Sequence, residues 1–365
     1  MKPKPILIVG MGPAGLSASI FLRQRGLAVV AIDRASQPQL KIGESLPPNA
    51  QSLLRQLGVW TTFQQDHHLK CYSNKSVWGN DQVQFHDFIQ QAPGYGWHID
   101  RLTFEQMLVE KAEQLGVQLY WSATLKHLQW HQDHWEVGLK QEEGVSSIHA
   151  SFLIDASGRN SWLGRRLGYE RLYEDRQLAL VAFLQSKDQE LGDSSSLIET
   201  HPDGWWYSAK IPNHQLATTF FCQPTPEQKA NWTQAEGWWA LAKTSPQFFR
   251  RLKEADFQLL TKPHFISADS GLLEKLCGPG WLALGDAAMT YDPIASHGLM
   301  MSMLSGRDAA AAIEDYLLGK ATSLAIYQDR LLNAFQYYQR ERQQFYDQEL
   351  RFPTSTYWKA RQRKR

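Results

Sequence analysis

Three glycines near the start of the chain have the spacing of a phosphate-binding turn. Gly10, Gly12 and Gly15 follow the apolar residues 6–9, which we expect to form a buried parallel strand, and precede apolar residues at helical spacing. In such a unit the first glycine permits the tight turn, the second lets a pyrophosphate approach the backbone, and the third brings helix and strand together. The amides that begin the helix then point at the phosphates along a favourable dipole.

An acidic residue stands where the ribose of a nucleotide is expected. A second apolar run, 27–32, ends at Asp33, close to the usual distance of about 20 residues after the glycines for a carboxylate that binds the ribose 2′-hydroxyl. Because a carboxylate there repels a 2′-phosphate, the pattern indicates FAD or NAD rather than NADP. A glycine-rich turn without a ligand is the simpler interpretation of the glycines alone, but the strand, the helix and Asp33 together favour a bound dinucleotide.

The composition limits the classes of function. The chain has 365 residues and a net charge of +1, so it is long enough for a large core in one or two joined domains and is not a general nucleic-acid binder. No apolar run approaches the roughly 18 residues of a membrane span or the core of a signal peptide, so we expect a cytoplasmic protein without a membrane partner. The three cysteines lie far apart and predict buried thiols and no metal site. The 14 tryptophans suit either a core or flat surfaces for a flavin or an aromatic substrate.

Charged residues stand out in two segments after the second strand. Lys41 and Glu44 lie in a loop of small and apolar residues, where they form either an incidental ion pair or part of a site. Asp100 and Arg101 precede a helix predicted over 103–115. Asp100 is placed to cap the amides of this helix, whereas Arg101 at that end of the dipole needs an anionic partner, such as a cofactor phosphate, or a carbonyl.

The pattern after residue 171 differs from that of the first segments. Residues 172–272 alternate apolar and polar side chains, which is typical of a half-exposed antiparallel sheet, and a buried strand returns at 281–284. We therefore expect an α/β fold in which a Rossmann-type domain with a parallel sheet is interleaved with an antiparallel-sheet substrate domain, followed by a C-terminal helical segment. The nucleotide-binding domain is expected over 1–70, 97–171 and 273–320, the substrate-binding domain over 71–96 and 172–272, and the C-terminal helix with a basic tail over 321–365.

Three motifs in a fixed order point to a family. Gly10 to Gly15, Asp155 to Gly158 and Gly285–Asp286 together resemble the single-Rossmann flavoprotein hydroxylase superfamily, over nearly the whole chain. Residues 41–45 and the second motif are similar to its tryptophan-halogenase branch. The resemblance implies FAD, with Asp286 at the ribityl chain, Arg101 near the pyrophosphate and 293–298 along the isoalloxazine. The implied cofactor-binding residues are Gly10, Gly12, Pro13, Ala14, Gly15, Asp33, Lys41, Glu44, Arg101, Asp155, Gly158, Gly285, Asp286, Pro293, Gly298 and Leu299.

Halogenation itself does not follow from this likeness. Halogenases of this branch carry the motif W-x-W-x-I-P, and residues 207–212 match it with Tyr207 and Ala209 in place of the two tryptophans. The bulky aromatics associated with halide oxidation are thus missing. Lys75 is the candidate for the lysine that relays hypohalous acid in halogenases, although residues 76–79 do not resemble that site.

A narrower group is similar over more segments. Residues 204–209, 296–298 and 349–358 resemble the flavoproteins that mature quinone-bearing amino-acid oxidases of the lysine ε-oxidase and glycine oxidase type. This resemblance implies an FAD-dependent monooxygenase that uses molecular oxygen to hydroxylate a tryptophan of a precursor amino-acid oxidase, which becomes part of a cysteine tryptophylquinone. The sequence has no second nucleotide motif, so the reductant is either transiently docked NAD(P)H or a separate electron donor.

Two titratable residues are candidates for catalytic proton transfer beside the flavin. His297 lies in the stretch along the isoalloxazine and is able to relay a proton during oxygen transfer, unless it caps the next helix or binds a carbonyl. Glu44 is the second candidate, with a structural ion pair to Lys41 as its alternative.

The tryptophan-rich segment supplies the candidate substrate-binding residues. Trp205, Trp206 and Tyr207 are expected at the mouth of the pocket, because aromatic residues anchor protein–protein contacts. Strand alternation places Trp206 on the opposite face from the other two, so part of the trio belongs to the core. Residues 361–365 are expected to form a solvated basic tail that steers an acidic partner. Two other functions stay open, a hydroxylase or halogenase of a free aromatic such as tryptophan and a flavin-bearing maturation chaperone without catalysis.

Overall fold

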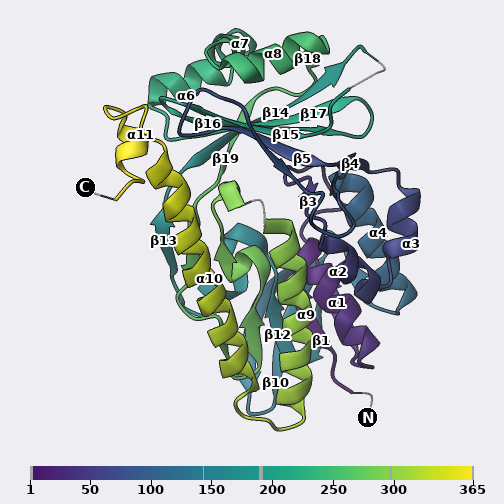
Figure 1. The fold of residues 1–365 in the computed structure, drawn as a ribbon. Coiled ribbons are helices and arrows are strands. Elements are labelled where there is room, and N and C mark those ends of the chain that lie inside the picture. Colours follow the sequence, from purple (N-terminus) through teal and green to yellow (C-terminus); the bar gives the residue numbers. More distant parts are fainter. Residues whose placement is uncertain (1–2, 143, 189–191, 296–297, 364–365) are drawn as a thin grey trace.

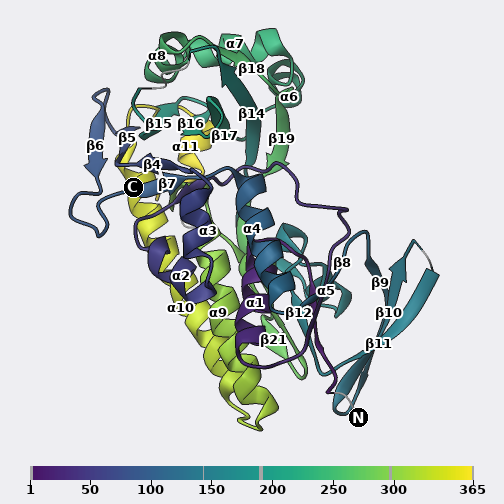
Figure 2. The same cartoon turned by 90° about the vertical axis from the view of Figure 1, so that its right-hand side faces the viewer.

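The computed structural model describes residues 3–142, 144–188, 192–295 and 298–363. Figure 1 shows two bodies, a lower one that combines long helices with a sheet and an upper one in which a second sheet carries short helices on its top. Figure 2 gives the view from the side. The mixed α/β class with a parallel and an antiparallel sheet and a helical C-terminal segment is as predicted. The exact boundaries of the two domains stay a prediction.

A six-stranded sheet lies at the centre of the lower body. It comprises β1 (Ile6–Val9), β2 (Val29–Ile32), β8 (Gln118–Tyr120), β12 (Phe152–Asp155), β21 (Cys277–Gly278) and β22 (Trp281–Ala283), in the order β21-β22-β12-β1-β2-β8. The three central strands are parallel, and Val9 lies opposite both Ile32 and Asp155. They therefore end at the same edge of the sheet, where Gly10 and Asp33 follow.

Four helices surround this sheet, namely α1 (Pro13–Gln24), α4 (Arg101–Gln114), α9 (Gly298–Leu317) and α10 (Ser323–Gln348). Helix α9 packs directly on α1, since a Cβ built on Gly306 would be 2.8 Å from the backbone nitrogen of Ala18. Helix α10 runs beside α9 in both views (Figures 1 and 2). Its amphipathic character is confirmed, because the apolar residues with helical spacing are all buried. These are Leu324, Tyr327, Leu331, Phe335 and Tyr338.

The upper body is built on an eight-stranded sheet. It comprises β5 (Ser73–Val77), β6 (Gln84–Asp87), β14 (Leu178–Ser186), β15 (Ser196–His201), β16 (Gly204–Ile211), β17 (Gln215–Cys222), β18 (Phe257–Leu259) and β19 (His264–Ser267). Their order is β18-β14-β17-β16-β15-β5-β6, with β19 paired to β14. The pairs are antiparallel except for β15 and β5, which run parallel.

The expectation of a half-exposed sheet is wrong, because this sheet is covered on both faces. Helices α6 (Pro226–Trp232), α7 (Ala235–Lys243) and α8 (Pro246–Glu254) lie on the outer face at the top of Figure 1. The inner face is covered by the end of α10, by α11 (Thr356–Lys359) and by the lower body. The side chains that alternate along β16 are therefore buried on both faces, except that Tyr207 is half-buried.

The segment after α10 is also more ordered than expected. Arg361 is 3% exposed and lies 2.8 Å from Asp175 in an ion pair, and Trp358 is fully buried. The prediction of a solvated basic tail is thus wrong for Arg361, which turns inward because the partly buried carboxylate of Asp175 is available to pair with it.

Three small sheets and three short helices complete the described chain. The sheets consist of β3 (Ser45–Leu46), β7 (Gly96–His98) and β4 (Leu69–Cys71), of β9 (Thr124–His131), β10 (His134–Gln141) and β11 (Gly144–Ala150), and of β13 (Arg171–Asp175), β20 (Ser270–Leu273) and β23 (Met289–Thr290). The helices are α2 (Ala50–Leu57), α3 (Trp60–Gln65) and α5 (Trp162–Arg166). All three cysteines are free and buried. Within the described ranges, no helix has the length and apolar character to cross a membrane, and His, Cys, Asp and Glu side chains form no cluster suited to a metal ion.

Candidate cofactor and active site

A cavity of about 870 Å³ lies between the two large sheets. Its floor is the edge of the six-stranded sheet where β1, β2 and β12 end, and its roof is the inner face of the eight-stranded sheet. The roof residues are Ala179, Tyr207, Thr219 and Phe221. Most of the residues expected to bind the cofactor gather on the floor and walls of this cavity.

The glycine turn combines two packing glycines with one that faces open space. Gly10 has a φ of +110°, and a Cβ there would be 2.2 Å from the carbonyl oxygen of Ala156. A Cβ on Gly15 would be 2.0 Å from the carbonyl oxygen of Gly10, so these two glycines are required by the fold itself. Gly12, the N-cap of α1, has no atom within 4 Å of its Cβ position, and no side chain caps the helix. The first amides of α1 thus open onto the cavity beside Pro13 and Ala14, which fits a pyrophosphate.

Asp33 is held on the cavity wall by the backbone. Its two carboxylate oxygens accept the amides of Met11 at 2.8 Å and Ala35 at 2.9 Å. Each carboxylate oxygen keeps a further lone pair, so the group remains able to accept a ribose hydroxyl. This arrangement fits the predicted role of Asp33.

The cations near the pyrophosphate position share one carboxylate that the sequence analysis missed. Arg101 donates through Nη2 to Glu105, and the Nζ of Lys41 lies 3.0 Å from the Oε2 of Glu105. Glu105 is 1% exposed and one helical turn after Arg101, a spacing that could have indicated the pair. The Nη1 of Arg101 donates to the carbonyls of Ile42 and Gly43, whereas its buried Nε has no hydrogen-bond partner among the described residues. This free donor fits an additional acceptor supplied by the cofactor.

Glu44 lies apart from these cations. It is 3% exposed on the cavity wall, and its Oε2 accepts the amide of Gly43 at 2.9 Å. The alternative interpretation of Glu44, a structural ion pair with Lys41, is wrong, because Lys41 pairs with Glu105 instead. The Tyr207 hydroxyl interacts with the Glu44 carboxyl and is 2.7 Å from the Oγ of Ser45. Burial raises the pKa of Glu44 and of Tyr207 above their ordinary values.

Of the motif that begins at the end of β12, the loop lines the cavity, whereas the first residue, Asp155, does not. Asp155 is fully buried, and its carboxylate accepts the amides of Ser157 at 3.0 Å and Gly164 at 2.8 Å. It therefore fixes the loop without lining the cavity, whereas Gly158 lines it with a φ of +72°. The assignment of Asp155 to the cofactor is corrected to a supporting role.

The motif after β22 places one carboxylate on the cavity. Asp286 lines the wall, 3.5 Å from the Nε of Arg159, and its side chain is 35% exposed. Gly285 has a φ of +55°, and a Cβ there would be 2.6 Å from the Cβ of Ala14. Gly285 thus keeps the Asp286 loop close to the start of α1, and Asp286 remains free to meet a cofactor hydroxyl.

The loop before α9 closes the cavity on a third side. Pro293, Gly298 and Leu299 line the cavity as expected. His297 lies outside the described residues. The loop is anchored at Asp292, whose Oδ2 accepts from Gln177 at 3.0 Å, Arg342 at 3.1 Å and Tyr346 at 2.8 Å.

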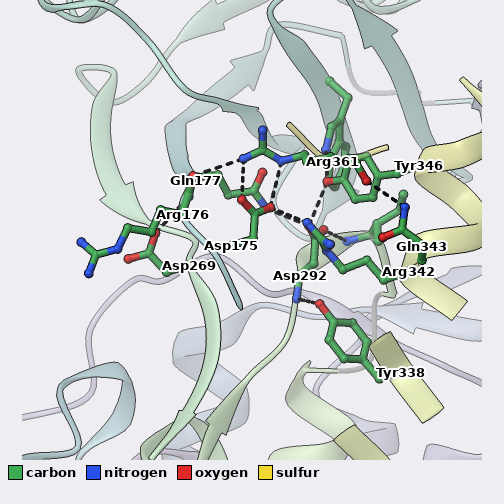
Figure 3. A network of polar contacts seen from close by, with 12 residues as sticks. Asp175, Arg176, Gln177, Asp269, Asp292, Tyr338, Arg342, Gln343, Tyr346 and Arg361 are labelled. Atoms are coloured by element: carbon green, nitrogen blue, oxygen red, sulfur yellow. Dashed lines mark hydrogen bonds and ion pairs between the residues drawn. The ribbon is translucent and has the colours of Figure 1, made fainter. Parts of the chain in front are cut away.

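Figure 3 shows that this anchor belongs to a larger polar network. Arg342 binds Asp175 as well as Asp292, and Asp175 in turn binds Arg361. The buried Asp292 and the partly buried Asp175 are thereby matched by two guanidinium groups, which offsets the cost of removing these charges from water. The cavity loop is thus fixed by residues of α10 and of the segment that follows it.

Three of the expected catalytic and substrate-binding residues do not reach the cavity. Trp205 and Trp206 are both fully buried. Trp205 packs in the inner cluster with Trp78 and Trp358. Trp206 packs against α8, where it stacks on Phe248. The predicted alternation is therefore right, but only Tyr207 of the trio is among the described residues that line the cavity. Lys75 lies on β5 with its Nζ 2.5 Å from Asp193, and is likewise absent from the described lining. Packing on both faces of the sheet is what removes the two tryptophans from the pocket mouth.

A phosphate-binding turn, a carboxylate at the ribose position and a cavity that continues under a second sheet define a dinucleotide-binding oxidoreductase. Residues 4–351 match the FAD binding domain family, and the chain belongs to this family. Its cofactor is FAD, and the protein is an FAD-dependent enzyme of the monooxygenase class. The predicted likeness to the tryptophan-halogenase branch of these enzymes is confirmed.

Three similar proteins illustrate the range of this family. The chain is 24% identical to the putative FAD-dependent oxidoreductase LodB of Marinomonas mediterranea, over 99% of this chain and 97% of LodB. The structure is similar to that of the flavin-dependent halogenase CmlS, with 23% identity and a TM-score of 0.89, over 100% of this chain and 68% of CmlS. It is also similar to the peptidyl tryptophan dihydroxylase QhpG, which is essential for tryptophylquinone cofactor biogenesis, with 22% identity and a TM-score of 0.78 over 98% of this chain and 78% of QhpG.

Proposed function

We propose that this protein hydroxylates a tryptophan side chain of a precursor amino-acid oxidase during the formation of its cysteine tryptophylquinone. The observation that carries the proposal is on β16, where the hydroxyl of Tyr207 lines the cavity and Ala209, two positions later on the same strand face, is fully buried and has only a methyl group. Halogenases of this branch carry two tryptophans at these positions. The likeness to the peptidyl tryptophan dihydroxylase QhpG supports a protein-bound tryptophan as the substrate.

The residues of the cavity have distinct roles in this proposal. The open space before Gly12 would receive the pyrophosphate, with Arg101 near it, Asp33 would bind the adenosine ribose, and Asp286 would contact the ribityl chain. FAD, once reduced, activates oxygen and supplies the oxygen atom that enters the substrate. The roof excludes water from the space between the flavin and the substrate, since Thr219 and Phe221 are nearly fully buried.

The remaining participants belong to the same proposal. Molecular oxygen is the second substrate, and electrons come from transiently docked NAD(P)H or from a separate donor protein. The cytoplasm is the proposed location of the reaction. His297 remains a candidate for proton transfer, whereas Lys75 pairs with Asp193 and is absent from the described lining of the cavity.

A single experiment separates this function from the two others. Purified holoprotein is reduced with dithionite and mixed aerobically with precursor oxidase, and the precursor is analysed by peptide mass spectrometry. The expected result is the gain of one or two oxygen atoms on one tryptophan, with no gain when the flavin-free protein is used. Oxygenation of free tryptophan but not of the precursor would favour a small-molecule hydroxylase. Stable binding of the precursor without any mass gain would favour a chaperone.

A further inference from the structure

The carboxylates on the cavity wall differ in what neutralises them. Asp33 is satisfied by two backbone amides, and Glu105, Asp286 and Asp292 each lie within ion-pair distance of a lysine or arginine. Asp33 and Glu44 have no ion pair among the described residues, and of these two only Glu44 is buried, with 3% of its surface exposed. A buried carboxyl group without a cation retains its proton to higher pH than an exposed one.

The groups that face Glu44 come from three elements. Arg101, the cation that acts on Glu44, is engaged by Glu105, so it stabilises the Glu44 anion only weakly. The Gly43 amide donates to its Oε2 and favours the anion. Tyr207 approaches from the roof. Burial outweighs these groups and raises the pKa of Glu44, which makes the protonated carboxyl available at pH values where an exposed glutamate is ionised.

Tyr207 lies next to both Glu44 and the cavity. Its hydroxyl lies 2.7 Å from the Oγ of Ser45 and interacts with the Glu44 carboxyl. Glu44 is itself held in place, because its carbonyl accepts the amide of Ile99 at 2.8 Å. The Tyr207 side chain shares the inner face of the sheet with Thr219, its partner in the register, and both line the cavity. The hydroxyl of Tyr207 is therefore able to contact both a substrate in the cavity and the Glu44 carboxyl.

We propose that Tyr207 is a catalytic acid and base that exchanges its proton with Glu44. This inference rests on the proposed oxygenation. In that reaction the O–O bond breaks and a C–O bond forms on the aromatic ring, while the second oxygen atom leaves as water, whose formation takes two electrons from the reductant and two protons from the reductant and the solvent. The Tyr207 hydroxyl donates a proton to the leaving oxygen and is recharged by Glu44. The ring carbon loses a proton when the ring regains aromaticity, and this proton returns through Tyr207 to Glu44. Tyr207 and Glu44 therefore end the cycle in the protonation states in which they began.

The test compares Tyr207→Phe, Glu44→Gln and the neighbouring roof variant Thr219→Val as FAD-loaded proteins. The first readout needs no substrate: the visible spectrum of the oxidised bound flavin is recorded across pH. We expect a transition above the ordinary glutamate pKa of 4.5 in wild type and in Thr219→Val, a shifted transition in Tyr207→Phe, and none in Glu44→Gln. A transition that persists unchanged in Glu44→Gln, or its absence from wild type, would overturn the assignment.

The second readout follows the fate of oxygen. Reduced protein is mixed with oxygen and precursor, and oxygenated tryptophan is compared with hydrogen peroxide in the same sample. We expect both Tyr207→Phe and Glu44→Gln to lower the yield of oxygenated product by about 100-fold or more in favour of peroxide, the usual contribution of a positioned acid or base. The assignment would also be overturned if Tyr207→Phe and wild type gave the same ratio of oxygenated tryptophan to hydrogen peroxide. If wild type oxygenates no tryptophan, the proposed function fails, while the spectral titration still decides whether Glu44 and Tyr207 share a proton.

Discussion

Replacing Gly12 with valine tests the phosphate site without disturbing the fold. The Cβ position of Gly12 has no neighbour within 4 Å, and its φ of −75° and ψ of −178° are open to any residue. The apoprotein therefore loses only what a poorer N-cap costs, about 1 kcal/mol. In the holoprotein, however, the valine side chain occupies the space through which a phosphate approaches the first amides of α1.

The size of the effect follows from the bonds that are lost. Hydrogen bonds from amides to a charged group contribute about 1.5–3 kcal/mol each, so losing two of them costs about 3–6 kcal/mol. At 1.4 kcal/mol per factor of ten, FAD affinity falls by about 100-fold to 10,000-fold. Flavin fluorescence titration of the apoprotein measures this change, and thermal unfolding of the same apoprotein measures the fold.

Gly10→Ala is the matched control, because it should give the opposite pattern. Its Cβ would be 2.2 Å from the carbonyl oxygen of Ala156 at a φ of +110°, so the apoprotein itself is destabilised, by about 2–4 kcal/mol. If Gly12→Val kept wild-type affinity for FAD, or if its apoprotein were as unstable as that of Gly10→Ala, the assignment of Gly12 to the pyrophosphate would be refuted.

Four further changes have defined outcomes. Reduced enzyme with oxygen, bromide and free tryptophan should form no bromotryptophan, and its detection by mass spectrometry above a no-enzyme control would restore the halogenase interpretation. Trp206→Ala should lower the free energy of unfolding in urea by about 3–5 kcal/mol, because Trp206 is fully buried; a stable variant that lost only activity would place it in the site after all. Arg342→Met should weaken FAD binding by releasing Asp292, whereas Arg340→Met, at an exposed position, should not. Equal FAD affinities of the two variants would show that the polar network does not support the cofactor site. The folded-state pKa of Glu44 is raised above 4.5, so the stability of wild type falls as pH rises from 4.5 through the folded-state pKa. Over that range the Glu44→Gln apoprotein should therefore gain stability relative to wild type. A difference in unfolding free energy that stays constant with pH in urea titrations would contradict this.

Features that depend on neighbouring residues were predictable from the sequence. The glycine turn and Asp33 act through a strand, a turn and a helix that are adjacent in the chain, and the edge at which they meet follows from parallel pairing. The cap at Asp100 is a local interaction as well, since its carboxylate accepts the amides of Leu102 and Thr103. Such features need no knowledge of tertiary contacts.

The partners of charged and aromatic residues depend on distant segments and were not predictable. Lys41 pairs with Glu105 rather than with Glu44, because the α4 helix places Glu105 under the loop. The alternation in β16 was visible, but the sequence could not show that α8 would cover the face that carries Trp206. The contact between Tyr207 and Glu44 was not predictable either, because it joins the roof of the cavity to a loop of the lower body.

The anchoring of the cavity loop has a consequence for how the protein is made. Asp292 is bound by Arg342 and Tyr346, which come 50 and 54 positions later in the chain, and Arg342 also binds Asp175, which is synthesised long before. During translation the phosphate turn and both sheets are complete while this loop still lacks its partners on α10. Flavin capture should therefore lag behind the folding of the sheets, and nascent chains arrested before Arg342 should emerge from the ribosome colourless.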